Sequence, residues 1–103
     1  MADFMKILQQ AQEMQGRFQK LQDELQQQTV TASSGGGMVT VEANGQGTVR
    51  SIKIDKSVVN ADDVEMLEDL LLVAVTEAQK KAQEAAQAEM GKLTGGLPFK
   101  LPF

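Results

Sequence analysis

The amino-acid sequence predicts an α+β fold in which two long helices flank a three-stranded antiparallel sheet. Three observations lead to this prediction. Apolar residues recur three and four positions apart from residue 4 to residue 25, as they do in a helix with one apolar seam. Residues 38–43 alternate between apolar and polar side chains, which is typical of a half-buried strand. From residue 64 onward a second apolar stripe again has helical spacing.

The first helix is expected over residues 3–28. Asp3 is placed to cap its first turn, and the positions between the apolar ones are mostly Gln, which favours a solvated helix. Gly16 costs roughly 1 kcal/mol relative to Ala inside a helix, so it indicates a close crossing or a bend. The apolar seam comprises Phe4, Ile7, Ala11, Met14, Phe18, Leu21 and Leu25.

Three short strands in a meander are expected over residues 29–32, 38–43 and 48–55. The Ser-Ser-Gly-Gly-Gly run over 33–37 predicts a turn. The Asn-Gly-Gln-Gly sequence at 44–47 predicts a hairpin, because Asn and Gly tolerate positive φ. Val49 is out of phase with the isoleucines of its strand, which indicates a bulge or a second buried face. The residues expected to face inward are Val39, Val41, Ala43, Ile52 and Ile54.

The second helix is expected over residues 62–93. Asn60 or Asp62 can cap it, and the carboxylates that follow suit the positive end of its macrodipole. Gly91 or the Gly95-Gly96 pair is expected to end it. Residues 1–96 are then one domain, and 97–103 form an irregular tail because of their prolines. The helix stripe comprises Val64, Leu67, Leu71, Ala74, Ala78, Ala82 and Ala85.

The lengths of these elements predict a homodimer. The helices should span roughly 37 and 45 Å, whereas the strands span only about 20 Å. The sheet is therefore too short to cover both apolar stripes, and the rest must meet another helix, in the same chain or in a second copy. A short sheet with open edges also invites pairing, and twofold symmetry is the usual outcome.

The residue types exclude most catalytic chemistry. The sequence contains no Cys and no His, so thiolate catalysis, the commonest general base and an ordinary zinc site are all excluded. The glycines at 35–37 are followed by no Lys, as a P-loop requires. Paired carboxylates such as Asp62 with Asp63 point in different directions on a helix, so we interpret them as caps and a solvated face. We expect neither an enzyme nor a metal or cofactor.

The sequence also predicts a cytoplasmic location. Its first fifteen residues place Asp3, Lys6 and Glu13 among several Gln, unlike the apolar run of a signal peptide. No stretch approaches the length of a membrane span, so no contact with a membrane is expected.

The distribution of charge bears on nucleic-acid binding more than its total does. The net charge is -4, which by itself disfavours phosphate binding. However, the acidic residues concentrate in 57–79, and the two helices carry separate basic groups. On composition alone such cations are typical of a solvated helix face, but in a dimer each group occurs twice and can engage duplex phosphates. The candidate DNA-binding residues are Lys6, Arg17, Lys20, Lys80, Lys81 and Lys92.

Four segments, in the family's order, resemble the YbaB/EbfC family of nucleoid-associated proteins. The resemblance implies an α-β-β-β-α protomer, a tight homodimer with protruding helices likened to tweezers, and double-stranded DNA as the partner. It also implies that the helices contact DNA, which places the six cations above in the binding region. The segments are 10–15 in the first helix, 35–41 with 44–47 and 49–55 in the hairpin, 63–70 at the second-helix opening, and 90–97.

We therefore predict a nucleoid-associated protein that binds duplex DNA as a homodimer, mainly through phosphate electrostatics and shape, in nucleoid organisation or gene regulation. The alternative is a protein–protein interaction adaptor that uses the helical arms or residues 97–103. That tail is short, apolar and rich in proline, a form that docks in grooves.

Overall fold

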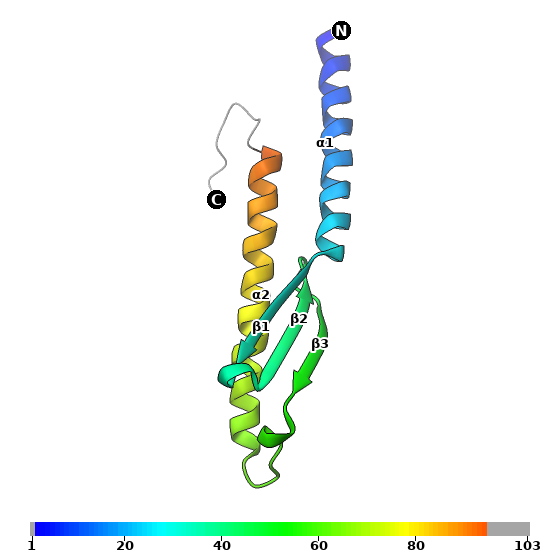
Figure 1. The fold of residues 1–103 in the computed structure, drawn as a ribbon. Coiled ribbons are helices and arrows are strands. Elements are labelled where there is room, and N and C mark those ends of the chain that lie inside the picture. The colour runs from blue at the N-terminus through cyan, green and yellow to red at the C-terminus, as the bar shows by residue number, and fades with distance from the viewer. Residues whose placement is uncertain (1, 95–103) are drawn as a thin grey trace.

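The computed structural model describes residues 2–94 and confirms the α-β-β-β-α order (Figure 1). Helix α1 runs down the molecule, and α2 runs back up beside the sheet and the lower part of α1. Single turns of 3-10 helix lie at 35–37 and 56–58. The elements are α1 (Ala2–Gln27), β1 (Thr29–Ser34), β2 (Val39–Asn44), β3 (Val49–Ile54) and α2 (Val64–Thr94).

The three strands form an antiparallel meander in the order β1-β2-β3. Val39 pairs with Ile54, and Ala43 pairs with Val49. Between these pairs the register of β2 and β3 shifts next to Glu42, so the predicted bulge is confirmed. At the hairpin turn, the Oδ1 of Asn44 accepts the N–H groups of Gln46 and Thr48 at 2.9 Å each, which satisfies this buried side chain.

The turn predicted over residues 33–37 is shorter in the structure. β1 continues through Ser33 and Ser34, because the Ser33 and Thr40 hydroxyls are 3.0 Å apart across the strands and the Ser34 hydroxyl donates to the Leu70 carbonyl oxygen at 2.6 Å. Only the three glycines turn, all with positive φ. Gly35 also lies against the Leu70 side chain, so it brings the β1–β2 connection close to α2.

The cap and the end of the second helix differ from the prediction. Asp63, and not Asn60 or Asp62, caps α2, since its Oδ1 accepts the Met66 N–H at 3.2 Å. The Oδ1 of Asn60 accepts the Asp62 N–H at 2.9 Å and so shapes the turn before the helix. α2 passes through Gly91 and continues to Thr94, so Gly91 does not end it. The predicted tail, 97–103, lies outside the described residues.

The core lies between α2 and the first two strands. Val39 and Val41 on β2 are fully buried, and they pack with Ala74 and Ala78 of α2. Alanines four residues apart share one face of the helix, and their small side chains let α2 lie close to the sheet. Ala32, Ala43 and Val58 complete the buried cluster.

The inward-facing isoleucines of β3 are exposed, contrary to prediction. Ile52 and Ile54 pair with Val41 and Val39, so they lie on the core face of the sheet, yet 46% and 39% of their surfaces are accessible. The reason is the placement of α2, which packs on β1 and β2 and largely misses β3.

The first helix is also mostly uncovered. Of its apolar seam, only Leu21 and Leu25 are buried, while Phe4 and Ile7 are each 60% exposed. Figure 1 shows the reason, since the upper part of α1 extends beyond the end of α2. A Cβ at Gly16 would meet nothing within 4 Å, so no close crossing occurs there. The predicted mismatch between helix and sheet lengths is therefore observed.

Candidate nucleic-acid interface

Hydrogen bonds between α1 and the β2–β3 hairpin fix the direction in which the first helix projects. The Gly45 N–H donates to the Leu25 carbonyl oxygen at 2.7 Å. The side-chain amide of Gln46 donates to the carbonyl oxygen and the Oε1 of Gln22, at 3.3 and 3.1 Å. Together they hold the last turns of α1 against the hairpin, so the first helix extends from a defined base.

Sequence reasoning missed the role of Arg50. The guanidinium of this β3 residue donates to the Gln26 carbonyl oxygen at 2.7 Å. α1 has no basic residue in its last turn, so a cation from the sheet meets the negative end of its dipole. The absence of a basic residue from the last turn of α1 was the signal in the sequence. It did not indicate that Arg50, from a distant strand, supplies the positive charge.

Three of the six candidate cations line one groove between the two helices. Arg17 and Lys20 come from α1, and Lys92 comes from the end of α2. We call this the cationic groove; its other lining residues are Leu21, Glu24, Glu89 and Leu93. The Nζ of Lys92 lies 3.4 Å from Glu89 Oε1, and most of the lysine side chain is exposed. With two carboxylates beside its three cations, the groove carries a small positive excess.

The other three candidate cations lie outside this groove. Lys6 is on the projecting part of α1, eleven residues before Arg17, which is about 16 Å along the axis and close to the same side of the helix. Lys80 and Lys81 are exposed on the middle of α2. The Nζ of Lys81 donates to the Thr31 carbonyl oxygen at 2.7 Å, so this lysine also covers the edge of β1.

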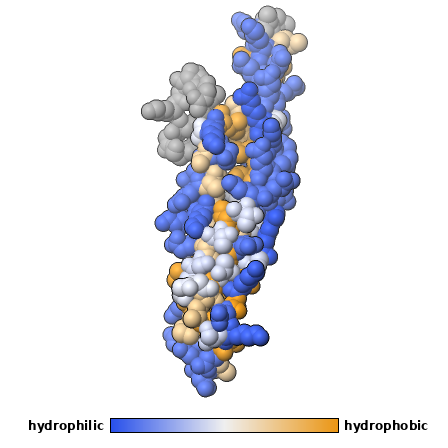
Figure 2. All heavy atoms as spheres, viewed as in Figure 1, coloured by the Kyte–Doolittle hydropathy of each residue, from blue (hydrophilic) through white to orange (hydrophobic). Residues whose placement is uncertain are grey.

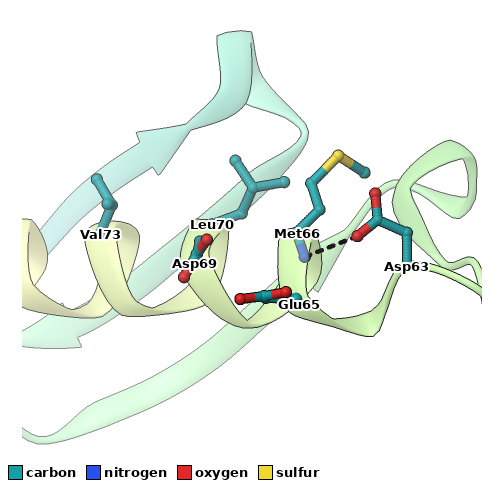
Figure 3. A pocket seen from close by; sticks show the side chains of 6 residues that line it. All are labelled: Asp63, Glu65, Met66, Asp69, Leu70 and Val73. Carbon is teal, nitrogen blue, oxygen red and sulfur yellow. Dashed lines mark hydrogen bonds between the residues drawn. The ribbon is translucent and has the colours of Figure 1, made fainter.

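A cluster of acidic residues lies at the opposite end of the molecule, at the start of α2. A shallow depression there is lined by Asp63, Glu65 and Asp69 together with three apolar side chains (Figure 3). The carboxylates of this cluster disfavour contact with phosphate at this end. The apolar residues of the depression are Met66, Leu70 and Val73.

Metal-binding groups and membrane-spanning helices are absent from the described part of the chain. Within residues 2–94, no group of three or more Asp or Glu side chains is arranged to hold a metal ion. No helix in that range is long and apolar enough to cross a membrane. Among residues 2–94, the one clear pKa shift belongs to Asp55, whose carboxyl pKa is lowered because the Ser57 N–H donates to its Oδ1 at 2.8 Å. That carboxylate caps the short turn at 56–58.

An uncovered apolar surface lies beside the core. It includes Ile52 and Ile54 on β3, and Leu72 on the flank of α2. Leu72 is two helical turns before Gln79, whose side-chain amide donates to Gly47 at the β2–β3 turn, so both face the β3 side. We call Ile52, Ile54 and Leu72 the β3 face. In Figure 2, hydrophobic surface, coloured orange, also shows between the two helices and around the sheet end.

Comparison with family models and known proteins gives consistent matches. Residues 1–97 match the model of the YbaB/EbfC DNA-binding family. A nucleoid-associated protein of Gemmatimonas aurantiaca is 55% identical, over 98% of this chain and 99% of that protein. One of Thermodesulfovibrio yellowstonii is 59% identical, over 96% of this chain and 85% of that protein.

A solved structure has the same fold. The crystal structure of an uncharacterized protein from Helicobacter pylori matches with a TM-score of 0.82 and 27% sequence identity. The match covers 89% of this chain and 97% of that one, so both helices and the sheet between them have counterparts there.

Proposed function

Because this chain belongs to the YbaB/EbfC DNA-binding family, we propose that it binds duplex DNA as a homodimer and serves nucleoid organisation or gene regulation. Binding is mainly electrostatic, through contacts of the two pairs of helical arms with phosphate groups. Lysine contacts to phosphate position a protein on DNA without reading bases, so binding depends little on sequence. Its place in the cell is then the nucleoid, in the cytoplasm.

One observation above all supports this mode of binding. Arg17, Lys20 and Lys92 meet in the cationic groove at the arm end, where they outnumber the carboxylates of Glu24 and Glu89, whereas Asp63, Glu65 and Asp69 lie at the far end. A duplex at the arms therefore meets a small positive excess of charge and stays away from the acidic cluster at the start of α2. Lys6, Lys80 and Lys81 extend this surface along both helices.

Dimerisation is supported by the β3 face. Its isoleucines lie on the core side of the sheet without a cover, and in the described part of the chain β3 pairs only with β2. An exposed edge strand beside an apolar surface is a site for association. A second copy placed there by a twofold axis would cover both surfaces at once and bring two sets of arms onto one duplex.

A salt titration of binding to duplex DNA tests the proposal. If the three groove cations of each protomer each neutralise one phosphate, log K falls with log salt with a slope of about -5. Competitor duplexes of unrelated sequence should bind with similar affinity. Failure to retain DNA even at low salt, or a slope near zero, would exclude the proposed mode.

The alternative function is that of an interaction adaptor. Among the described residues, it is favoured by the exposed apolar side chains Phe4, Met5 and Ile7 on α1. The other predicted adaptor element, the tail at 97–103, lies outside the described residues. An adaptor would keep its partner after the groove cations are neutralised, whereas DNA binding would be lost.

A further inference from the structure

The upper part of α1 has an apolar ridge that no described residue covers. We define the arm ridge as Phe4, Ile7, Ala11, Met14 and Phe18, which follow one another at heptad spacing. The same series continues into Leu21 and Leu25, which are 6% and 4% exposed. A straight helix drifts only about 20° per heptad, so the arm ridge stays on the side of α1 that faces α2 lower down. The described residues leave the ridge uncovered because α2, which covers the lower part of α1, extends only to Thr94.

The place where α2 ends decides what can cover the ridge. Glu89, Lys92 and Leu93 line the cationic groove with Arg17 and Lys20, so α2 ends beside the base of the arm ridge. α1 and α2 run in opposite directions (Figure 1). α2 therefore ends beside the Phe18 end of the ridge, with its axis directed toward the Phe4 end.

From this geometry we propose that residues 97–103 of the same chain lie along the arm ridge and cover it. The proposal does not depend on DNA binding. Leu97, Phe99, Leu101 and Phe103 alternate with Pro98, Lys100 and Pro102, so in an extended chain the four apolar side chains share one side. Proline fixes its own φ and restricts the residue before it to extended conformations.

The lengths agree. Six intervals of an extended, strand-like chain span about 20 Å at 3.3 Å each. The ridge from Phe4 to Phe18 spans about 21 Å at 1.5 Å per residue. The Gly95-Gly96 pair between helix and tail permits the change of direction. A segment tethered this closely has an effective concentration in the millimolar range, which favours it over a separate partner.

Contact between the tail and the arm ridge would also explain why the projecting part of α1 is helical. An isolated helix of about fifteen residues is marginal in water, even with favourable composition. The part of α1 before Arg17 carries four Gln and a Gly, and α2 gives it no support. Apolar contact along the ridge supplies the stabilisation that the sequence of the arm lacks.

Hydrogen exchange of the full chain and of a chain ending at Gly96 tests this proposal. We expect amides in residues 4–14 to exchange at least about fivefold faster without the tail, while β2 amides remain unchanged and report an intact fold. A full-length variant with Leu97, Phe99, Leu101 and Phe103 all replaced by Ser should behave like the truncation. Lys100→Ser should behave like the wild type. Equal arm protection in all four proteins would overturn the proposal.

Engineered cysteine pairs identify the occupant, because the chain has no cysteine of its own. Ile7→Cys with Leu101→Cys should form a disulfide within one chain. The control, Gln9→Cys with Leu101→Cys, should not, since Gln9 is about 200° around the helix from both Ile7 and Ala11. Equal yields from the two pairs, or disulfides only between two chains, would contradict docking of the tail on its own arm.

Discussion

The backbone N–H of Gly45 and the carbonyl oxygen of Leu25 form a hydrogen bond of 2.7 Å that joins the β2–β3 hairpin to the last turn of α1. A Cβ at Gly45 would lie 2.8 Å from that same oxygen. Only glycine fits at this position without displacing its neighbours. The contact therefore sets the distance between the hairpin and α1.

Gly45→Ala is expected to lower the free energy of unfolding by about 1–3 kcal/mol, because backbone atoms on both sides must move apart. Gly16→Ala is the matched control. A Cβ there meets nothing within 4 Å, and alanine favours a helix interior, so we expect a gain of about 0.5–1 kcal/mol. Urea unfolding of the three proteins measures both changes. Equal stability of the Gly45 variant and the wild type would argue against the close contact.

Neutralising the groove should weaken DNA binding. Arg17→Gln with Lys20→Gln removes two of the cations that line it, and in a dimer four. We expect at least about a tenfold loss of affinity at low salt and a slope of log K against log salt less negative by about 3 to 4. The control, Lys53→Gln with Lys56→Gln, makes the same change of net charge away from the arms. Comparable losses in the two variants would indicate a general effect of charge.

The β3 face should control dimerisation. Ile52→Ser with Ile54→Ser removes apolar surface that a second copy would bury, and a fully buried Ile contributes roughly 1.5–3 kcal/mol. We therefore expect the dissociation constant of the dimer to rise at least about tenfold in analytical ultracentrifugation. Leu8→Ser, on the arm, should leave it unchanged. If the isoleucine variant stays as dimeric as the wild type, the interface lies elsewhere.

Acid should remove the contribution of Asp55 to stability. Its native carboxyl pKa is lowered from the usual value of 3.8, mainly by the hydrogen bond from the Ser57 N–H. The charged form is thus favoured in the folded protein, and its contribution is complete above the unfolded pKa and declines as pH falls through the native pKa. Wild type should exceed Asp55→Ala in stability at pH 5 to 7, with the difference shrinking below about pH 3.8. A difference that stays constant down to pH 2 would contradict this cause.

The sequence predicted the elements well because their signals are local. Alternation identified β2, and the offset of Val49 identified the bulge. The choice of cap at α2 failed because Asn60, Asp62 and Asp63 are all competent caps, and the exact first turn decides among them. The exposure of Ile52 and Ile54 was not predictable, since the pattern gives their face of the sheet but not the width that one helix covers.

The candidate interface depended on tertiary structure in the same way. Lys80 and Lys81 are adjacent lysines that the sequence does not distinguish. In the structure, Lys81 donates to the carbonyl oxygen of Thr31, fifty residues away. The meeting of Arg17 and Lys20 with Lys92 depends on where α2 ends relative to α1. Helical periodicity places each cation on its own helix but carries no information about the distance between two helices.

Because the described residues hold α1 only near its C-terminal end, a small rotation there moves its N-terminal end over a long distance. The hydrogen bonds at Leu25 and Gln26 act as a pivot, and Phe4 lies about 32 Å away along the axis. A rotation of about 10° at the pivot displaces the Phe4 end by roughly 6 Å, which is about the width of a DNA minor groove. In the proposed dimer, small adjustments around Arg50 and Gly45 would therefore widen or narrow the gap between the α1 helices of the two protomers while the core of the sheet stays in place.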